Sequence, residues 1–146
     1  MKIAFVFPGQ GSQSVGMLDS FRDNAAVQSV VTRASSALGQ DLGALIGAGP
    51  GEELNLTINT QPALLAAGYA IYTAWRAAGG AEPTVVAGHS LGEYTALVAA
   101  GAVELEDAVR LVRFRAQAMQ EAVPVGVGSM AAILGLSDEQ VRQACS

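Results

Sequence analysis

Residues 85–94 read VVAGHSLGEY, and this stretch indicates the fold more clearly than any other part of the chain. The apolar run Thr84–Ala87 predicts a short strand, and the small residues that continue to about Ala100 predict a helix. Gly88-His89-Ser90-Leu91-Gly92 lies between them, which is the context of a nucleophile elbow. In such a tight turn the serine hydroxyl stands clear of the backbone. We interpret Ser90 as a nucleophile, and the alternative is a chance match in a glycine-rich chain.

Two backbone N–H groups are candidates for an oxyanion hole beside Ser90. The predicted helix begins beneath the serine, so the N–H of Leu91 is the natural first donor. The glycine-rich sequence FPGQGSQ (residues 7–13) follows another predicted strand. Ligands bind at the carboxyl ends of parallel strands, which would bring Gln10 to the same edge as Ser90. Its N–H is the candidate second donor, and the alternative is a plain surface loop.

His89 is the single histidine of the chain, but it is a poor candidate for the general base. Adjacent residues on a sharp turn point apart, whereas a base must lie within about 2.6–3.2 Å of the nucleophile. We expect His89 to be packed and hydrogen-bonded at the elbow. The chain therefore offers a nucleophile without an evident base.

The remaining pattern predicts an α/β fold with a parallel sheet, because strands alternate with helices. Lys2–Phe7 (KIAFVF) predicts a buried strand, and residues 39–60 predict one or two short helical turns. The expected helices are Asn24–Leu38 with Gly39 as its stop, a helix opened by Thr60-Gln61-Pro62 and ending near Ala78, Glu104–Ala122, and a last helix capped by Ser137. Met130–Leu134 predicts a third strand.

Arg115 falls on the apolar face of the helix predicted over Glu104–Ala122. At about 100° per residue from Ala108, Arg110 and Arg113 lie in a polar arc near 120–220° and are expected in solvent. Arg115 lies near 340°, among the apolar residues. A buried guanidinium needs a partner, and its planar fork suits a carboxylate. It could form a structural ion pair, reach out to solvent, or bind a substrate carboxylate.

Composition excludes several classes of protein. The chain has 146 residues, 51% hydrophobic and 14% charged, so it is not intrinsically disordered. No basic cluster exists for nucleic acid, and no apolar stretch is long enough to span a membrane. A single cysteine, Cys145, excludes an internal disulfide and a cysteine-based metal site. Without a recognisable signal peptide, the cytoplasm is the expected compartment.

Four segments together resemble a known family: FVFPGQGSQ, NTQPALL, AGHSLGEYTALVAAGA and RLVRFRAQAMQEAVP. The family is malonyl-CoA:acyl-carrier-protein transacylase of bacterial fatty-acid synthesis, and the acyltransferase domains of polyketide synthases are its close relatives. The resemblance implies that Ser90 carries malonyl as an ester and that Gln10 and Leu91 form the oxyanion hole. It implies that Arg115 binds the malonyl carboxylate and that Gln61 lies near the site. Malonyl-CoA and acyl-carrier protein would be the partners, with no metal or redox cofactor.

The resemblance also implies how the chain is organised. The family has an α/β-hydrolase-like core with an inserted ferredoxin-like subdomain. Residues 1–126 would be the first part of that core, and residues 127–146 the incomplete beginning of the subdomain. The family's base histidine belongs to the second half, for which this chain has no counterpart. We therefore expect a fragment or a partial sequence, and a chain of only these residues should fold poorly and turn over slowly.

Three other interpretations remain open. A patatin-like hydrolase with a serine–aspartate pair would act on apolar acyl groups and give Arg115 no role. A non-catalytic fragment would only bind a carrier protein or a partner chain. An acyltransferase domain of a polyketide synthase is disfavoured by Met1, which stands directly before the first strand. The sequence does not distinguish malonyl from methylmalonyl.

Overall fold

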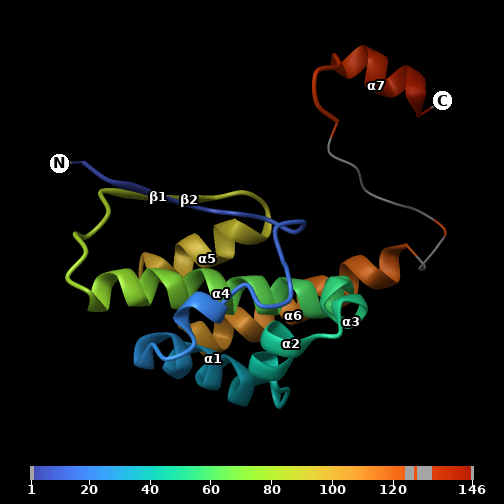
Figure 1. The fold of residues 1–146 in the computed structure, drawn as a ribbon. Helices are drawn as coiled ribbons and strands as arrows, with labels where there is room; N and C mark the ends of the chain where they lie inside the picture. Colours follow the sequence, from blue (N-terminus) through green and yellow to red (C-terminus); the bar gives the residue numbers. More distant parts are fainter. Residues whose placement is uncertain (1, 124–126, 128–132, 146) are drawn as a thin grey trace.

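Two parallel strands lie on a group of helices in the computed structural model, which describes residues 2–123, 127 and 133–145 (Figure 1). In chain order the elements are β1 (Ala4–Phe7), the 3₁₀ helix η1 (Asp19–Phe21), α1 (Ala25–Leu38), α2 (Leu42–Ala48), α3 (Gly51–Asn55), α4 (Thr57–Ala77), β2 (Val85–Gly88), α5 (Leu91–Ala99), α6 (Leu105–Ala122) and α7 (Asp138–Ala144). The predicted α/β class and the parallel pairing are confirmed.

The register of the two strands brings their carboxyl ends together. Ala4 is paired with Val85 and Phe7 with Gly88, so the loop after β1 and the turn after β2 leave the sheet side by side. This is the edge at which parallel sheets bind ligands. This pairing confirms the sequence prediction that the loop after β1 and Ser90 lie at the same edge of the sheet.

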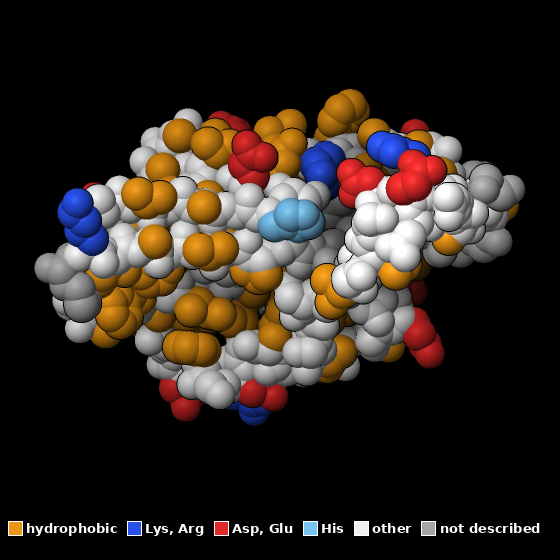
Figure 2. All heavy atoms as spheres, turned by 90° about the horizontal axis from the view of Figure 1, so that it is seen from above, with side chains coloured by type: hydrophobic (Ala, Val, Ile, Leu, Met, Phe, Trp, Pro, Cys, Tyr) orange, Lys and Arg blue, Asp and Glu red, His pale blue; other side chains and the backbone are white. Residues whose placement is uncertain are grey.

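The prediction that β1 is fully buried is wrong. Phe7 is 5% exposed and packs with Tyr72 and Ala96, but Val6 on the opposite face is 73% exposed. In the described part of the chain, α4 and α5 cover one face of the sheet only. Figure 2, viewed from the side of the strands, shows hydrophobic side chains across the other face. An apolar run therefore indicates a strand here without indicating burial on both faces.

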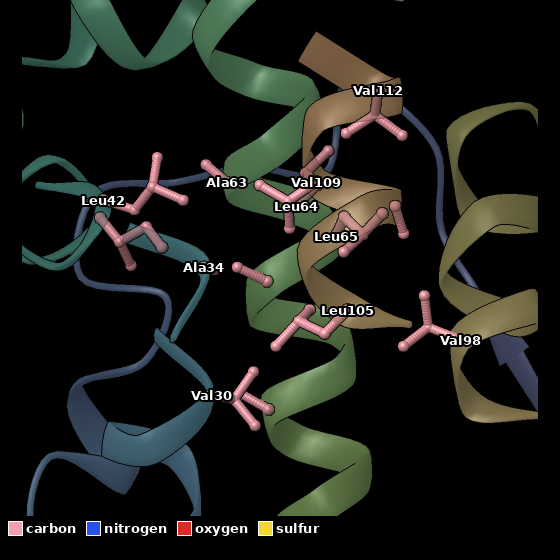
Figure 3. Packing of buried hydrophobic residues seen from close by; sticks show 14 of the residues in the cluster. Val30, Ala34, Leu42, Ala63, Leu64, Leu65, Val98, Leu105, Val109 and Val112 are labelled. Carbon is pink, nitrogen blue, oxygen red and sulfur yellow. The ribbon is translucent and has the colours of Figure 1, made fainter. Parts of the chain in front are cut away.

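The larger of the two hydrophobic clusters lies between helices, and the smaller one, around Phe7, packs against the sheet. α4 crosses the middle of the molecule and packs against α1, α5 and α6. Figure 3 shows the aliphatic side chains that fill this space, among them Val30 of α1, Leu65 of α4 and Val109 of α6. Ala34, Ala63 and Ala66 are completely buried in the same cluster. These small side chains let the helices approach closely, so the core is made of many small contacts.

Local signals placed most helix ends correctly. The Asn24 side chain accepts hydrogen bonds from the N–H groups of Ala26 and Val27 at 3.0 and 3.2 Å, which caps α1. Gly39 ends the same helix with a φ of 63°, a conformation that favours glycine. Ser137 and Gln140 form a capping box at the start of α7. Two short helices, α2 and α3, occupy residues 39–60 as expected.

The predicted start of α4 is wrong, because the helix begins at Thr57 rather than after Thr60. Thr60 is completely buried, and its hydroxyl donates to the carbonyls of Leu54 and Leu56 at 2.6 and 3.0 Å. The hydroxyl is therefore a donor to preceding carbonyls and does not accept as an N-cap would. Pro62 consequently lies inside the helix, where its missing N–H removes one backbone hydrogen bond.

The sequence predictions for the C-terminal part of the chain fall largely on residues that the structure does not describe. Residues 130–132 of the expected third strand lie outside the described residues, and Ile133 and Leu134 belong to no helix or strand. The proposed division at residues 126 and 127 stays a prediction. In Figure 1, α7 stands apart from the other helices. Among the described residues, no helix combines the length and the apolar character needed to cross a bilayer.

Candidate active site

Ser90 occupies a strained turn between β2 and α5. Its φ is 53° and its ψ is −110°, and it is the one residue other than glycine with a positive φ in the described part of the chain. A backbone conformation of this kind costs on the order of 1–3 kcal/mol and persists where the surrounding structure enforces it. Such strain is typical of functional sites, and here it projects the serine side chain from the end of the sheet.

The two flanking glycines are required by close backbone contacts. A Cβ atom on Gly88 would lie 1.9 Å from the carbonyl carbon of Gly92. A Cβ atom on Gly92 would lie 2.2 Å from the carbonyl oxygen of Phe7. The glycine-x-serine-x-glycine pattern is therefore the steric condition for α5 to start directly against the ends of both strands.

The backbone N–H of Leu91 is free to bind a ligand. At the start of α5, the N–H groups of Gly92 and Glu93 donate to the carbonyls of His89 and Ser90 at 2.8 and 3.1 Å. The N–H of Leu91 has no acceptor among the described residues. It lies at the positive end of the helix, where a developing negative charge is stabilised. Its assignment to an oxyanion hole stays a prediction that this geometry favours.

The loop after β1 lies against the elbow. A Cβ atom on Gly9 would be 2.9 Å from the carbonyl oxygen of His89, so the two backbones are in contact. The side chain of Gln10 turns to Thr57, whose Oγ1 accepts from Nε2 at 3.0 Å. The Gln10 backbone N–H has no acceptor within the part of the chain that the structure describes. Gln10 thus remains a candidate second donor.

The side chain of Arg115 reaches Ser90 from the apolar face of α6. Its Nη2 donates to Ser90 Oγ at 3.0 Å, and its Nη1 donates to Gln61 Oε1 at 2.8 Å. The guanidinium carbon also lies 5.6 Å from the centre of the Tyr94 ring, within range of a cation–π contact. Helices α4, α5 and α6 each contribute one side chain to this arrangement.

Arg115 has no carboxylate partner among the described residues. Five other arginines of the described chain do: Arg22, Arg33, Arg76, Arg110 and Arg142. Of the three alternatives for Arg115, a structural ion pair is thereby excluded for this part of the chain. A half-buried guanidinium beside a serine hydroxyl can bind a carboxylate with two parallel hydrogen bonds.

Gln61 connects this site to the core. It is completely buried, and its Nε2 lies 3.3 Å from the sulfur of Met119, one turn after Arg115 on α6. The resemblance had placed Gln61 near the site, but the contributions of Met119 and Tyr94 were not predicted. Their spacing carried a signal, since Met119 is four residues after Arg115 and Tyr94 four residues after Ser90.

Two expectations for polar residues are corrected. His89 is exposed, and its side chain makes no hydrogen bond with a described residue (Figure 2). Arg113 is half-buried instead of solvated, because Gln40 covers it and accepts from its Nη2. Its Nε is buried without a described partner, and desolvation lowers the pKa of Arg113.

No general base and no metal cluster is found in the described residues. Ser90 Oγ is hydrogen-bonded to Arg115, a cation that cannot accept a proton. Within residues 2–123, 127 and 133–145, no three histidine, cysteine, aspartate or glutamate side chains come together as a metal site would require. The described site therefore contains a candidate nucleophile, candidate oxyanion donors and a cation.

The fold and the elbow place this chain in the class of α/β proteins that present a serine on a strained turn between a strand and a helix. Comparison with known sequences is more specific. The model of the acyl transferase domain family matches residues 4–146, and the chain belongs to that family.

Relatives named for malonyl transfer cover nearly the whole chain. The malonyl CoA-acyl carrier protein transacylase of Escherichia coli (strain K12) is 57% identical over 145 residues, which are 99% of this chain and 47% of the relative. The crystal structure of an acyl-carrier-protein S-malonyltransferase from Burkholderia pseudomallei 1710b is 70% identical, with a TM-score of 0.91, and the match covers 99% of this chain and 47% of that one.

A third relative was solved with a partner. It is a malonyl-transacylase in complex with a type II PKS acyl-carrier protein, 51% identical with a TM-score of 0.91, over 99% of this chain and 47% of that one. The chain spans about half the length of each of these relatives. The match supports the acyltransferase fold expected from the resemblance, while the role of each site residue stays a prediction.

Proposed function

We propose that this chain is part of an acyltransferase that moves a malonyl group from coenzyme A to an acyl-carrier protein through an ester on Ser90. The observation that carries the proposal is the guanidinium of Arg115, which has no described carboxylate partner and lies 3.0 Å from Ser90 Oγ. The names of the relatives and the carrier-protein complex among them support the same reaction.

The reaction has two balanced displacements. In the first, Ser90 Oγ attacks the thioester carbonyl, the C–O bond forms, the C–S bond breaks, and the proton of the serine ends on the sulfur of coenzyme A. In the second, the phosphopantetheine thiol of the carrier protein attacks the ester and its proton returns to Ser90. No electrons are exchanged with a redox partner, so we expect no redox cofactor, and the family resemblance implies that no metal is needed. The proton acceptor must be a group outside the described residues.

The free backbone donors would act on the charged intermediate. When Ser90 attacks, the carbonyl oxygen becomes an oxyanion, and the N–H groups of Leu91 and Gln10 are the proposed donors to it. Removing one such donor from an oxyanion hole costs about 10²–10³ in turnover in a well-studied protease. Both donors here belong to the backbone, so side-chain substitution does not delete them.

Arg115 would select acyl groups that end in a carboxylate. A guanidinium fork binds a carboxylate through two charge-assisted hydrogen bonds, whereas an acetyl group would leave the half-buried cation without an anion. The patatin-like interpretation gives the same residue no such role. Selection by charge therefore distinguishes the two candidates. We further expect the cytoplasm as the compartment of this reaction.

Single-turnover acylation tests the proposal. The chain is incubated with malonyl-CoA for long enough to capture a slow reaction, and its intact mass is followed before and after addition of a phosphopantetheinylated carrier protein. We expect one malonyl adduct that disappears as the carrier protein gains it, and no adduct on Ser90→Ala. A malonyl adduct that forms on Ser90→Ala as fast as on the unaltered chain would overturn the proposal.

A further inference from the structure

The guanidinium of Arg115 is held on three sides, which fixes its distance from the elbow. Gln61 Oε1 accepts from Nη1 at 2.8 Å, Ser90 Oγ accepts from Nη2 at 3.0 Å, and the Tyr94 ring lies 5.6 Å from the guanidinium carbon. Gln61 belongs to α4, Tyr94 to α5, and Ser90 to the turn before α5. A long, flexible arginine side chain would otherwise lose this position readily, because several rotatable bonds would have to be kept ordered.

Gln61 is the rigid member of the three. It is completely buried on α4, next to Pro62, within the helix that forms the centre of the core. Its amide can face Arg115 in one orientation only, since a flipped amide would set its NH₂ group against the donors of the guanidinium. At the other end of the amide, Nε2 donates to the sulfur of Met119 at 3.3 Å, which favours the observed orientation.

This arrangement fixes both ends of an acyl group in the reaction proposed above, on which the inference rests. The carbonyl must lie at the N–H of Leu91 and at Ser90 Oγ. The carboxylate must lie at a guanidinium that is itself within hydrogen-bonding distance of Ser90 Oγ. The space between carbonyl and carboxylate is therefore short, and a longer chain would have to buckle or push the arginine back.

We propose that Gln61 is a positioning residue that sets the length of the ω-carboxyacyl group by preventing Arg115 from withdrawing from Ser90. Gln61 does not touch the acyl group in this proposal. It acts through the guanidinium, and it makes malonyl a better ligand than succinyl, which has one more methylene. One methylene in a confined site is worth about 10–200-fold in discrimination.

Binding measurements on a Ser90→Ala background test this without requiring a general base or an ester. The affinities of malonyl-CoA, succinyl-CoA and acetyl-CoA are measured by calorimetric titration, with and without Gln61→Asn, which keeps the amide and shortens its arm by one methylene. We expect malonyl-CoA to bind about tenfold more tightly than succinyl-CoA, and the ratio to fall to about twofold with Gln61→Asn. Gln117→Asn, the same change on the exposed side of α6, should leave the ratio unaltered.

The outcomes separate this inference from the proposed function. If malonyl-CoA binds no more tightly than acetyl-CoA, the carboxylate role of Arg115 is wrong. If malonyl-CoA is preferred over acetyl-CoA but Gln61→Asn leaves the malonyl-to-succinyl ratio unchanged, the positioning role of Gln61 is wrong. A purely structural role would weaken all three thioesters equally and would also overturn it.

A milder variant covers the case in which Gln61→Asn does not fold. Met119→Leu keeps the side-chain volume and removes the sulfur that orients the amide. We expect a smaller fall in the malonyl-to-succinyl ratio in the same direction, with the fold monitored by circular dichroism. An unchanged ratio in a folded Met119→Leu protein would contradict the proposal.

Discussion

Substituting alanine for Gly92 should damage both the fold and the elbow, against the usual effect of this change in a helix. Gly92 is the second residue of α5, and alanine in a helix is normally favoured over glycine by about 0.5–1 kcal/mol. The new Cβ atom, however, would lie 2.2 Å from the Phe7 carbonyl oxygen and 2.8 Å from its carbonyl carbon. These are backbone atoms, so no side-chain rotation relieves the clash.

The cost can be worked out from the contacts of Phe7. The end of β1 would have to move by about 1 Å to reach an ordinary contact distance. Its carbonyl also accepts from the N–H of His89 at 3.2 Å, and that hydrogen bond would be lost. Overpacking of about 1–3 kcal/mol and one hydrogen bond of about 1 kcal/mol exceed the helical gain. We expect a net loss of about 1–3 kcal/mol, a fall in Tm of about 3–10 °C for a chain of this size.

Gly47→Ala is the matched control for this prediction. Gly47 lies within α2, and a Cβ atom added there would meet no atom within 4 Å. Helix propensity alone then operates, and we expect a small gain in the free energy of unfolding. Both variants are compared by urea and thermal unfolding, and the rate of Ser90 acylation is measured in parallel. A Gly92→Ala protein as stable and as reactive as Gly47→Ala would refute the steric account of the elbow.

Three further predictions concern a salt bridge, the core and Arg115. Arg33 donates to Glu106, and this hydrogen bond lowers the pKa of the Glu106 carboxyl. The pair therefore adds to the free energy of unfolding above the ordinary glutamate pKa, and this contribution is lost as the pH falls through the lowered pKa. The free energy of unfolding of Glu106→Gln should be lower than that of the parent by less than about 1 kcal/mol at pH 7, because both side chains of the pair are partly exposed. This difference should vanish in acid, and a difference that stays constant with pH would exclude the linkage. Leu65→Ala should lower the free energy of unfolding in urea by about 3 kcal/mol, because Leu65 is completely buried. Leu97→Ala, at a position 39% exposed, should lower it by less than about 1 kcal/mol, and equal losses would contradict the assigned core. Arg115→Lys should weaken malonyl-CoA about tenfold in titrations, because an ammonium cannot reproduce the fork that contacts two partners, and unchanged affinity would argue against bidentate binding.

Periodicity and turn chemistry predicted the parts of the fold that depend on local sequence. The 3.6-residue period of α6 placed Arg115 on the side that faces the elbow, and the elbow pattern predicted the strained turn at Ser90. Caps at Asn24, Gly39 and Ser137 follow from side-chain chemistry within a few residues. Such signals are readable in one sequence because the interacting groups are neighbours in the chain.

The errors at Arg113 and β1 involve contacts between distant segments, whereas the error at Thr60 involves residues only four and six positions earlier. Thr60 was expected to be an N-cap, but its hydroxyl donates to the carbonyls of Leu54 and Leu56. Arg113 lies in the polar arc of α6, yet Gln40, 73 residues away, covers it. One face of β1 is exposed because the described helices pack on the opposite face. The outcomes at Arg113 and β1 could not be derived from the local residue pattern.

The central claim is that a cation fixed beside Ser90 selects acyl groups that carry a carboxylate, and a competition experiment tests it most directly. The chain is given equal amounts of malonyl-CoA and acetyl-CoA, and peptide mass spectrometry measures the ratio of the two acyl groups on Ser90. The account predicts malonyl in large excess, and a reversal towards acetyl in Arg115→Ala. The same ratio in both proteins, or acyl groups on residues other than Ser90, would contradict it.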